Sequence, residues 1–116
     1  MRKTYTGRCH CGTVVFRAET DLDRVVRCNC SICRKKNALM HRLKKEDLTI
    51  VQGEDNLTVY QFNTRTAKHF FCKTCGIHPF HHTRVAPDYA TVNVNCLDGV
   101  DADSLPVTMF DGQALS

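Results

Sequence analysis

Seven of the eight cysteines fall in three short clusters, and their spacing restricts the folds open to this chain more than any other feature. The clusters are Cys9-His-Cys11-Gly12, Cys28-Asn-Cys30-Ser-Ile-Cys33 and Cys72-Lys-Thr-Cys75-Gly76. Cysteines two or three positions apart can direct their sulfurs at one metal ion, and a glycine directly after them can take the positive φ that such turns need. We therefore expect a small fold built around zinc.

The redox conditions of the cellular compartment decide whether clustered cysteines bind metal or form disulfides. The first residues of the chain are polar, and no apolar segment typical of an export signal follows them. We expect a cytoplasmic, soluble protein, in which thiols stay reduced and clustered cysteines bind metal. No apolar stretch approaches the roughly 20 residues of a membrane span, so we expect no contact with a membrane.

The 116 residues predict one zinc-binding domain over residues 1–116. Short segments in which β-branched and aromatic residues alternate with polar ones predict strands. These segments are 14–18, 48–51, 57–62, 67–71 and 90–96, with connecting turns at 52–56, 63–66 and 97–99. Short helices are expected at 31–36 and, on a weaker pattern, at 101–105. The pattern predicts a mainly β fold of small antiparallel sheets stapled by metal, with one or two short helices.

The first and third clusters together supply four cysteines. Cys9, Cys11, Cys72 and Cys75 match the closed, tetrahedral ligand set of a structural zinc site. Such a site would tie the start of the chain to a segment some 60 residues further on and restrict the unfolded chain. The competing interpretation of these residues is a set of free, buried thiols.

The middle cluster supplies only three cysteines. Cys28, Cys30 and Cys33 match a catalytic zinc site, in which a fourth position stays open for an exchangeable ligand. Two alternatives remain: Cys96 or a histidine completes a second structural site, or the cluster is a redox dithiol. The simplest interpretation of Cys96 is a buried apolar residue.

The formal charge of +4 gives little support to nucleic-acid binding. Seven zinc-bound thiolates on two zinc ions would cancel most of this charge, because bound cysteines are deprotonated. We therefore expect nucleic acid to be an unlikely partner.

The order of the clusters, and the residues around them, resembles a known family. The segments that carry the resemblance are the CxCG motif at 9–12, Cys28-Asn-Cys-Ser-Ile-Cys33-Arg-Lys, Phe71-Cys-Lys-Thr-Cys-Gly-Ile-His-Pro-Phe80 and Val92-Asn-Val-Asn-Cys-Leu-Asp98. Together they are similar to the glutathione-dependent formaldehyde-activating enzyme family, which also includes centromere protein V. The resemblance runs from Gly7 to about Gly112.

The resemblance implies a β-tent of two or three small antiparallel sheets with two zinc ions. It implies that Cys9, Cys11, Cys72 and Cys75 hold the structural zinc, and that Cys28, Cys30 and Cys33 hold the catalytic zinc. The implied reaction adds glutathione to formaldehyde and gives S-(hydroxymethyl)glutathione, which is formally a carbon–sulfur lyase reaction run in reverse.

This reaction suits a three-cysteine site. A thiol that enters the open position becomes a thiolate, which is the species that attacks a carbonyl carbon. Three thiolates weaken zinc as a Lewis acid and favour the exchange of thiols over the activation of water. Arg34, Lys35 and Lys36 could meet the carboxylates of glutathione, or they could form a solvated basic surface.

Three histidines follow the last cysteine cluster closely. One of His78, His81 and His82 could protonate the new alkoxide, although each could equally be a packing or surface residue. The alternative function is a non-catalytic, zinc-stabilised module that binds a small thiol, a protein or a nucleic acid. The sequence gives no indication of the oligomeric state.

Overall fold

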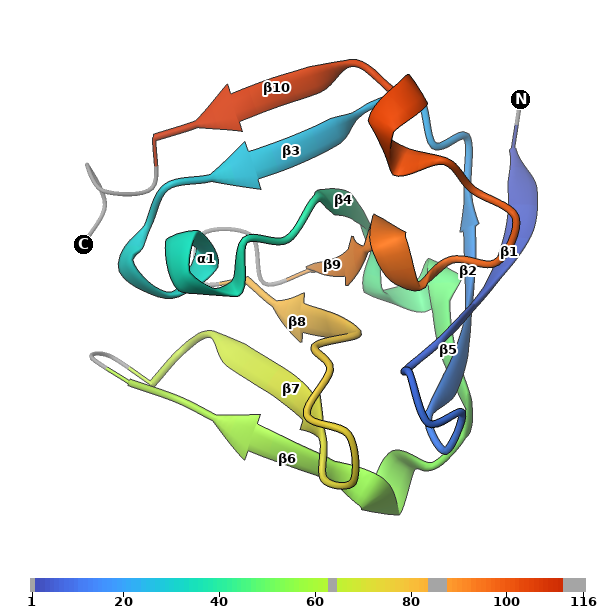
Figure 1. Ribbon diagram of the computed structural model, residues 1–116, viewed down its shortest axis with the longest axis vertical. Helices are drawn as coiled ribbons and strands as arrows, with labels where there is room; N and C mark the ends of the chain where they lie inside the picture. Colours follow the sequence, from blue (N-terminus) through green and yellow to red (C-terminus); the bar gives the residue numbers. More distant parts are fainter. Residues whose placement is uncertain (1, 63–64, 84–87, 112–116) are drawn as a thin grey trace.

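A computed structural model describes residues 2–62, 65–83 and 88–111, and it consists mainly of strands (Figure 1). The strands are β1 (Lys3–Arg8), β2 (Val15–Thr20), β3 (Val25–Cys28), β4 (Met40–Lys44), β5 (Leu48–Gln52), β6 (Leu57–Tyr60), β7 (Lys68–Cys72), β8 (Phe80–His82), β9 (Tyr89–Asn93) and β10 (Val107–Phe110). One α-helix, α1 (Ser31–Lys36), and four short 3₁₀-helices complete the described structure. The prediction of a mainly β fold with few helices is confirmed.

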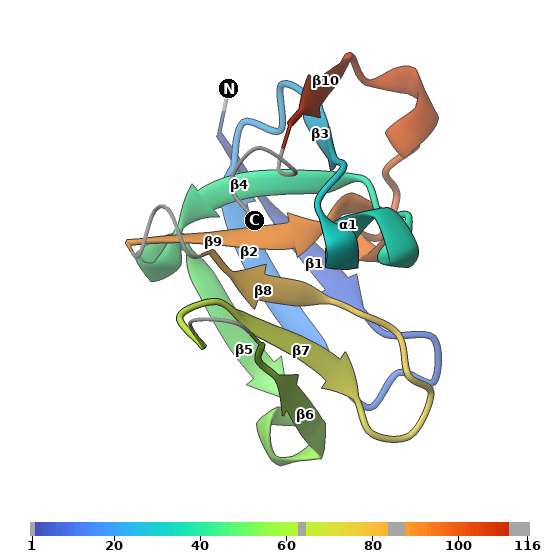
Figure 2. The ribbon, with the colours of Figure 1, turned by 90° about the vertical axis from the view of Figure 1, so that its left-hand side faces the viewer.

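The strands form two sheets. A three-stranded antiparallel sheet has the order β1-β2-β5, and a seven-stranded sheet has the order β10-β3-β4-β9-β8-β7-β6. Every pair in the larger sheet is antiparallel except β10 with β3, which run parallel. Figure 2 shows the larger sheet as a fan of strands with the three-stranded sheet behind it and α1 in front. One sheet is therefore larger than we expected, and it is mixed.

The hydrophobic core lies between the two sheets. Phe16 of β2 and Phe80 of β8 are almost fully buried, and their rings meet edge to face with centroids 5.6 Å apart. Val92 of β9 and Leu43 of β4 belong to the same buried cluster. This contact across the sheets fixes the position of β8, which carries one residue of the pocket, His81.

Gly7 allows β1 to pass directly over the Phe16 ring. The two residues pair across the β1–β2 ladder, and the place where a Cβ would stand at position 7 is occupied by that ring. Only glycine fits there. The close approach holds the end of β1, and with it the loop that carries Cys9 and Cys11.

The predicted helix at 31–36 coincides with α1. The weaker helix expected at 101–105 is a 3₁₀-helix, Ala102–Ser104. Part of the predicted turn at 63–66 lies outside the described residues, because positions 63 and 64 are not among them.

The strand predicted at 90–96 is wrong at its C-terminal end. β9 stops at Asn93, and a 3₁₀-helix, Val94–Cys96, follows it. The Asn93 side chain accepts a hydrogen bond from the Asn95 amide, which caps this helix and ends the strand.

Within the described ranges, none of the helices is long and apolar enough to cross a membrane.

Candidate metal centres and the adjoining pocket

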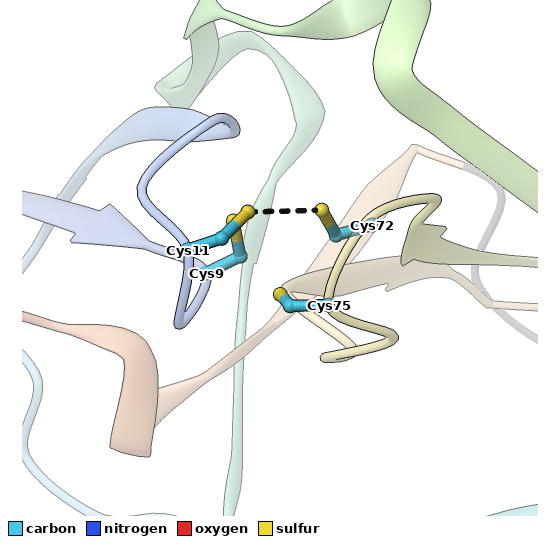
Figure 3. A group of neighbouring side chains, drawn as sticks. All are labelled: Cys9, Cys11, Cys72 and Cys75. Atoms are coloured by element: carbon cyan, nitrogen blue, oxygen red, sulfur yellow. Dashed lines mark hydrogen bonds between the residues drawn. The ribbon is translucent and has the colours of Figure 1, made fainter.

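The first and third cysteine clusters meet, as the sequence predicts. Cys9 and Cys11 lie in the loop after β1, and Cys72 and Cys75 lie in the turn at the end of β7. Figure 3 shows the four sulfurs turned toward one another from these two segments. All four lie within 4.8 Å of one another.

The spacing of these sulfurs fits zinc. Tetrahedral zinc with Zn–S bonds of about 2.3 Å requires sulfurs roughly 3.8 Å apart. The Sγ of Cys11 lies 3.6 Å from the Sγ of Cys9 and 3.7 Å from the Sγ of Cys72. All eight cysteines of the chain are free thiols, and none forms a disulfide. The four-cysteine cluster could therefore hold a zinc ion.

The backbone around the four cysteines supplies the turns that their spacing needs. Gly12 and Gly76 both take positive φ, at 82° and 77°. The amide of Gly76 donates to the Cys72 carbonyl, and the amide of Val14 donates to the Cys9 Sγ at 3.3 Å. An amide that donates to sulfur stabilises the thiolate form, which is the form that binds metal.

Burial is uneven across this cluster. Cys9 and Cys72 are each 2% exposed, whereas Cys11 is exposed. Burial raises the pKa of the Cys9 thiol to about 11. Without metal this cluster would thus contain at least one protonated thiol at neutral pH, whereas a bound zinc ion would hold the sulfurs as thiolates.

The middle cluster forms a second group at the junction of β3 and α1. Cys28 ends β3, Cys30 is the residue before the helix, and Cys33 is a buried residue of α1. The three sulfurs lie within 4.8 Å of one another and could hold a zinc ion. Within residues 2–62, 65–83 and 88–111, no further cysteine, histidine, aspartate or glutamate joins this group.

Cys96 is a buried core residue, as the sequence analysis favoured. It is 9% exposed, packs in the main core cluster, and donates weakly to the His78 carbonyl at 3.9 Å. Burial raises the pKa of this thiol to about 12. A thiol in this setting behaves as a small apolar side chain.

A cavity of about 530 Å³ adjoins the three-cysteine group. Cys28, Cys30 and Cys33 all line it, and none of the other four clustered cysteines does. His69 and His81 form part of the same wall. The two groups of cysteines thus differ in surroundings, because the three-cysteine group lines this cavity and the four-cysteine group does not.

The lining of this cavity carries charges of both signs. Asp21, Asp23, Arg24 and Arg42 line it, and all four are exposed. The guanidinium of Arg42 lies over the Tyr89 ring, 5.8 Å from its centroid. Acidic and basic groups side by side suit a zwitterionic molecule better than a simple anion.

The basic residues after the third cysteine divide between two environments. Arg34 and Lys35 are exposed and do not line the cavity in the described structure, whereas Lys36 is half-buried and its Nζ lies 3.0 Å from His78 Nε2. Of the predicted histidines, His81 lines the cavity, His78 lies behind its wall, and His82 does not line it in the described structure.

His69 was missed by the sequence analysis. It lies in the predicted strand 67–71, outside the quoted motifs. The pairing of β7 with β8 identifies it, because this pairing places His69 opposite His81. The sequence analysis also missed a second group, whose potential metal-ligand atoms lie within 4.8 Å of one another. Its members are Asp21, Asp23 and His41. The two ring nitrogens of His41 already contact Thr20 Oγ1 at 2.7 Å and the Arg24 carbonyl at 2.9 Å, so the ring has no free ligand atom.

Comparison with known proteins places these features in a family. The family model described as glutathione-dependent formaldehyde-activating enzyme matches residues 4–110. A crystal structure of a Rhodobacter sphaeroides protein is similar in fold, with a TM-score of 0.82 and 44% sequence identity. That similarity covers 89% of this chain and 99% of the other chain. The family match includes every residue of the three cysteine clusters.

Proposed function

Because the chain belongs to the glutathione-dependent formaldehyde-activating enzyme family, we propose that it adds a thiol such as glutathione to formaldehyde and thereby acts as a zinc-dependent, carbon–sulfur lyase-type enzyme. The product would be S-(hydroxymethyl)glutathione. The observation that carries this proposal is that all three sulfurs of the smaller cysteine group line one cavity.

The two cysteine groups take different roles in this proposal. Cys9, Cys11, Cys72 and Cys75 form a complete ligand set away from the cavity, which is the arrangement of a structural site. Cys28, Cys30 and Cys33 form an incomplete set at the cavity wall, which is the arrangement of a catalytic site. A zinc ion held by these three sulfurs would keep an entering thiol as a thiolate beside the second substrate.

Charged residues at the cavity support a substrate like glutathione. The tripeptide carries one ammonium group and two carboxylates at neutral pH. Asp21 and Asp23 can meet the ammonium, while Arg24 and Arg42 can meet the carboxylates. The apolar side chains Ile32, Met40 and Phe62 also line the cavity and would limit the contact of a bound thiol with water.

The test is the rate of adduct formation in the presence of the zinc-loaded protein. Exchange spectroscopy by NMR measures the interconversion of free glutathione and S-(hydroxymethyl)glutathione at equilibrium, with the uncatalysed rate subtracted. We expect acceleration by the wild-type protein and none by Cys30→Ser. An unchanged rate with wild type, together with no spectral change at the metal on adding glutathione, would overturn the proposal. Binding of glutathione without acceleration would support the non-catalytic thiol-binding module instead.

A further inference from the structure

Four side chains form a hydrogen-bonded chain whose two ends line the cavity, and we call them the Lys36–histidine cluster. They are Lys36 at the end of α1, His69 on β7, His78 just before β8, and His81 on β8. Lys36 Nζ lies 3.3 Å from His69 Nδ1 and 3.0 Å from His78 Nε2. His78 Nε2 lies 3.3 Å from His81 Nδ1.

The protonation state of His78 follows from its neighbours. Its Nδ1 lies 2.7 Å from the Phe70 carbonyl oxygen, which can only accept, so Nδ1 carries a hydrogen. Burial, together with the charge of Lys36, lowers the pKa of His78 to about 3, so the ring is neutral. His78 Nε2 is therefore bare, and it accepts a hydrogen bond from the Lys36 ammonium.

This state of His78 sets the state of His81. Because the His78 Nε2 is bare, the His81 Nδ1 that faces it must carry a hydrogen. Burial holds the pKa of His81 well below its usual value, so the ring is neutral and its Nε2 is bare.

The bare nitrogen of His81 makes no hydrogen bond within the described part of the protein. In the described part of the chain, no recorded hydrogen bond involves His81 Nε2, yet no buried side-chain nitrogen there lacks a partner. The atom is therefore not fully enclosed, although the residue is only 7% exposed, and His81 lines the cavity. It presents a proton acceptor to whatever occupies that space.

His69 presents the opposite polarity. An ammonium group can only donate, so His69 Nδ1 accepts from Lys36. Burial lowers the pKa of His69 to about 4, and the neutral ring therefore carries its hydrogen on Nε2. His69 also lines the cavity, and its ring centroid lies 5.0 Å from that of His81.

We infer that the Lys36–histidine cluster is a proton relay that joins a base, His81 Nε2, to an acid, the His69 Nε2–H, at two points of the wall that the three cysteines share. The inference rests on the proposed function, since addition of a thiol to an aldehyde removes a proton from sulfur and delivers one to oxygen. A wall that offers an acceptor and a donor side by side serves both transfers.

The proton balance of the relay closes. The thiol proton passes to His81 Nε2, the sulfur electron pair forms the C–S bond, and the carbonyl π pair moves to oxygen. The new alkoxide takes the hydrogen of His69 Nε2, and His69 Nδ1 takes a proton from Lys36. His81 Nδ1 then gives its hydrogen to His78 Nε2, which passes it to Lys36.

After one addition Lys36 and His78 return to their starting states, while His69 and His81 end as the other neutral tautomers. Those tautomers are the starting point for the reverse reaction, in which the adduct is cleaved. Exchange with water at the two Nε2 atoms, once the product has left the cavity, restores the first state.

The first experiment determines the histidine tautomers directly and does not depend on enzymatic activity. Two-dimensional ¹H–¹⁵N spectra of the zinc-loaded protein distinguish a ring hydrogen on Nδ1 from one on Nε2. We expect Nδ1–H on His78 and His81, and Nε2–H on His69. Either an Nε2–H on His81 or an imidazolium at this position near pH 7 would overturn the relay.

The second experiment uses three lysine variants in the adduct-exchange assay. Lys36→Met removes the link, and Lys36→Arg keeps a cation that donates hydrogen bonds but does not release a proton in the working pH range. We expect both to lower kcat by about 10²-fold, the usual contribution of acid–base catalysis, with KM within about twofold of wild type. Lys68→Met is the matched control, because Lys68 is exposed, is a neighbour of His69 on β7, and does not line the cavity in the described structure. It should leave kcat unchanged.

The solvent isotope effect separates a relay from a merely structural lysine. We expect a curved proton inventory for wild type, since several protons move, and a linear one for Lys36→Arg. Full activity in Lys36→Arg would show that charge alone is needed and would overturn the relay. An inactive wild-type protein would instead count against the proposed function, and the relay would then be overturned only by a wrong tautomer pattern in the first experiment.

Discussion

The Sγ atoms of Cys11 and Cys72 lie 3.7 Å apart, although 61 positions separate the two residues in the sequence. This contact joins the loop after β1 to the end of β7, and hence one strand of the small sheet to one strand of the large sheet. The small buried group around Cys9, Val14 and Cys72 adds little apolar area of its own. We therefore expect the metal, rather than the packing, to hold this corner of the fold.

Cys72→Ser should unfold the protein. An apparent binding free energy of about 10–16 kcal/mol for structural zinc exceeds or matches the whole stability of a small domain, roughly 5–15 kcal/mol. We expect loss of the cooperative thermal transition, measured by circular dichroism, and a zinc content below one ion per chain.

Two other cysteine variants serve as controls for that result. Cys96→Ala removes a buried thiol outside both groups and should cost only about 1 kcal/mol while leaving the zinc content at the wild-type value. Cys30→Ser should keep the fold and lose only the second ion. If Cys30→Ser melts as early as Cys72→Ser, the three-cysteine group is a structural site.

With a zinc ion in each cysteine group, as we propose, chelation should remove the two ions in a fixed order. The three-cysteine group opens on a cavity and lacks a fourth protein ligand in the described structure, whereas the four-cysteine group surrounds its centre. Zinc should therefore leave Cys28, Cys30 and Cys33 first. We expect a fast phase that releases one equivalent to a chromogenic chelator with no change in circular dichroism, followed by a slow phase that accompanies unfolding. Simultaneous release of both equivalents would contradict this assignment.

The sequence predicts the cysteine groups well because metal-ligand spacing is local. A CxC or CxxC segment brings its own sulfurs together, and α1 begins directly after Cys30, as its spacing predicts. The pairing of two distant segments into one group also follows from ligand number. What a local pattern cannot give is the register between strands, and His69 enters the cavity wall only because β7 pairs with β8.

Several strands were missed for the same reason. All four residues of β10 are exposed, so no alternation of apolar and polar faces identifies it, and it exists through its parallel pairing with β3. Lys36 is a similar case, because basic residues in the last turn of a helix usually face water. Here the face of the helix that carries Cys33 is buried. Lys36 lies three residues later on the same face, so its side chain is also turned inward.

Stability should fall as the pH drops below about 6.5. Burial lowers the folded-state pKa of His69 to about 4 and of His78 to about 3, while an unfolded histidine titrates near 6.5. Between these values the unfolded chain binds more protons than the folded one. Each of the two rings therefore lowers the free energy of unfolding by up to about 1.4 kcal/mol for every unit by which the pH falls. Urea unfolding between pH 5 and 7 measures this slope.

His69→Gln gives the matched comparison for that slope. The substitution removes one of the histidines whose pKa is lowered but leaves both cysteine groups unchanged. The acid sensitivity of metal binding at those groups is then common to both proteins. We expect a shallower dependence in the variant, by about 1 kcal/mol per pH unit. Parallel slopes would mean that the pKa of His69 is the same in the folded and the unfolded protein.

Gly7→Ala should destabilise the fold through Phe16. An added Cβ meets the Phe16 ring, which is fully buried and cannot move without disturbing Phe80. Overpacking of this kind costs about 1–3 kcal/mol. A double-mutant cycle with Phe16→Leu, which leaves room beside position 7, should recover part of that loss. Equal costs of Gly7→Ala in the two backgrounds would show that the ring is not the obstacle.

Arg42 should distinguish glutathione from small, uncharged thiols. It is an exposed residue of β4 that lines the cavity and lies over Tyr89, where its guanidinium can meet a carboxylate of the tripeptide. An exposed ion pair contributes at most about 1 kcal/mol, which corresponds to roughly fivefold in Kd. We expect Arg42→Met to raise the KM for glutathione by about that factor and to leave the KM for 2-mercaptoethanol unchanged. Arg17→Met is the control, since Arg17 is exposed on β2 and does not line the cavity in the described structure. An equal rise for both thiols would show that Arg42 shapes the cavity rather than recognising the charge of its occupant.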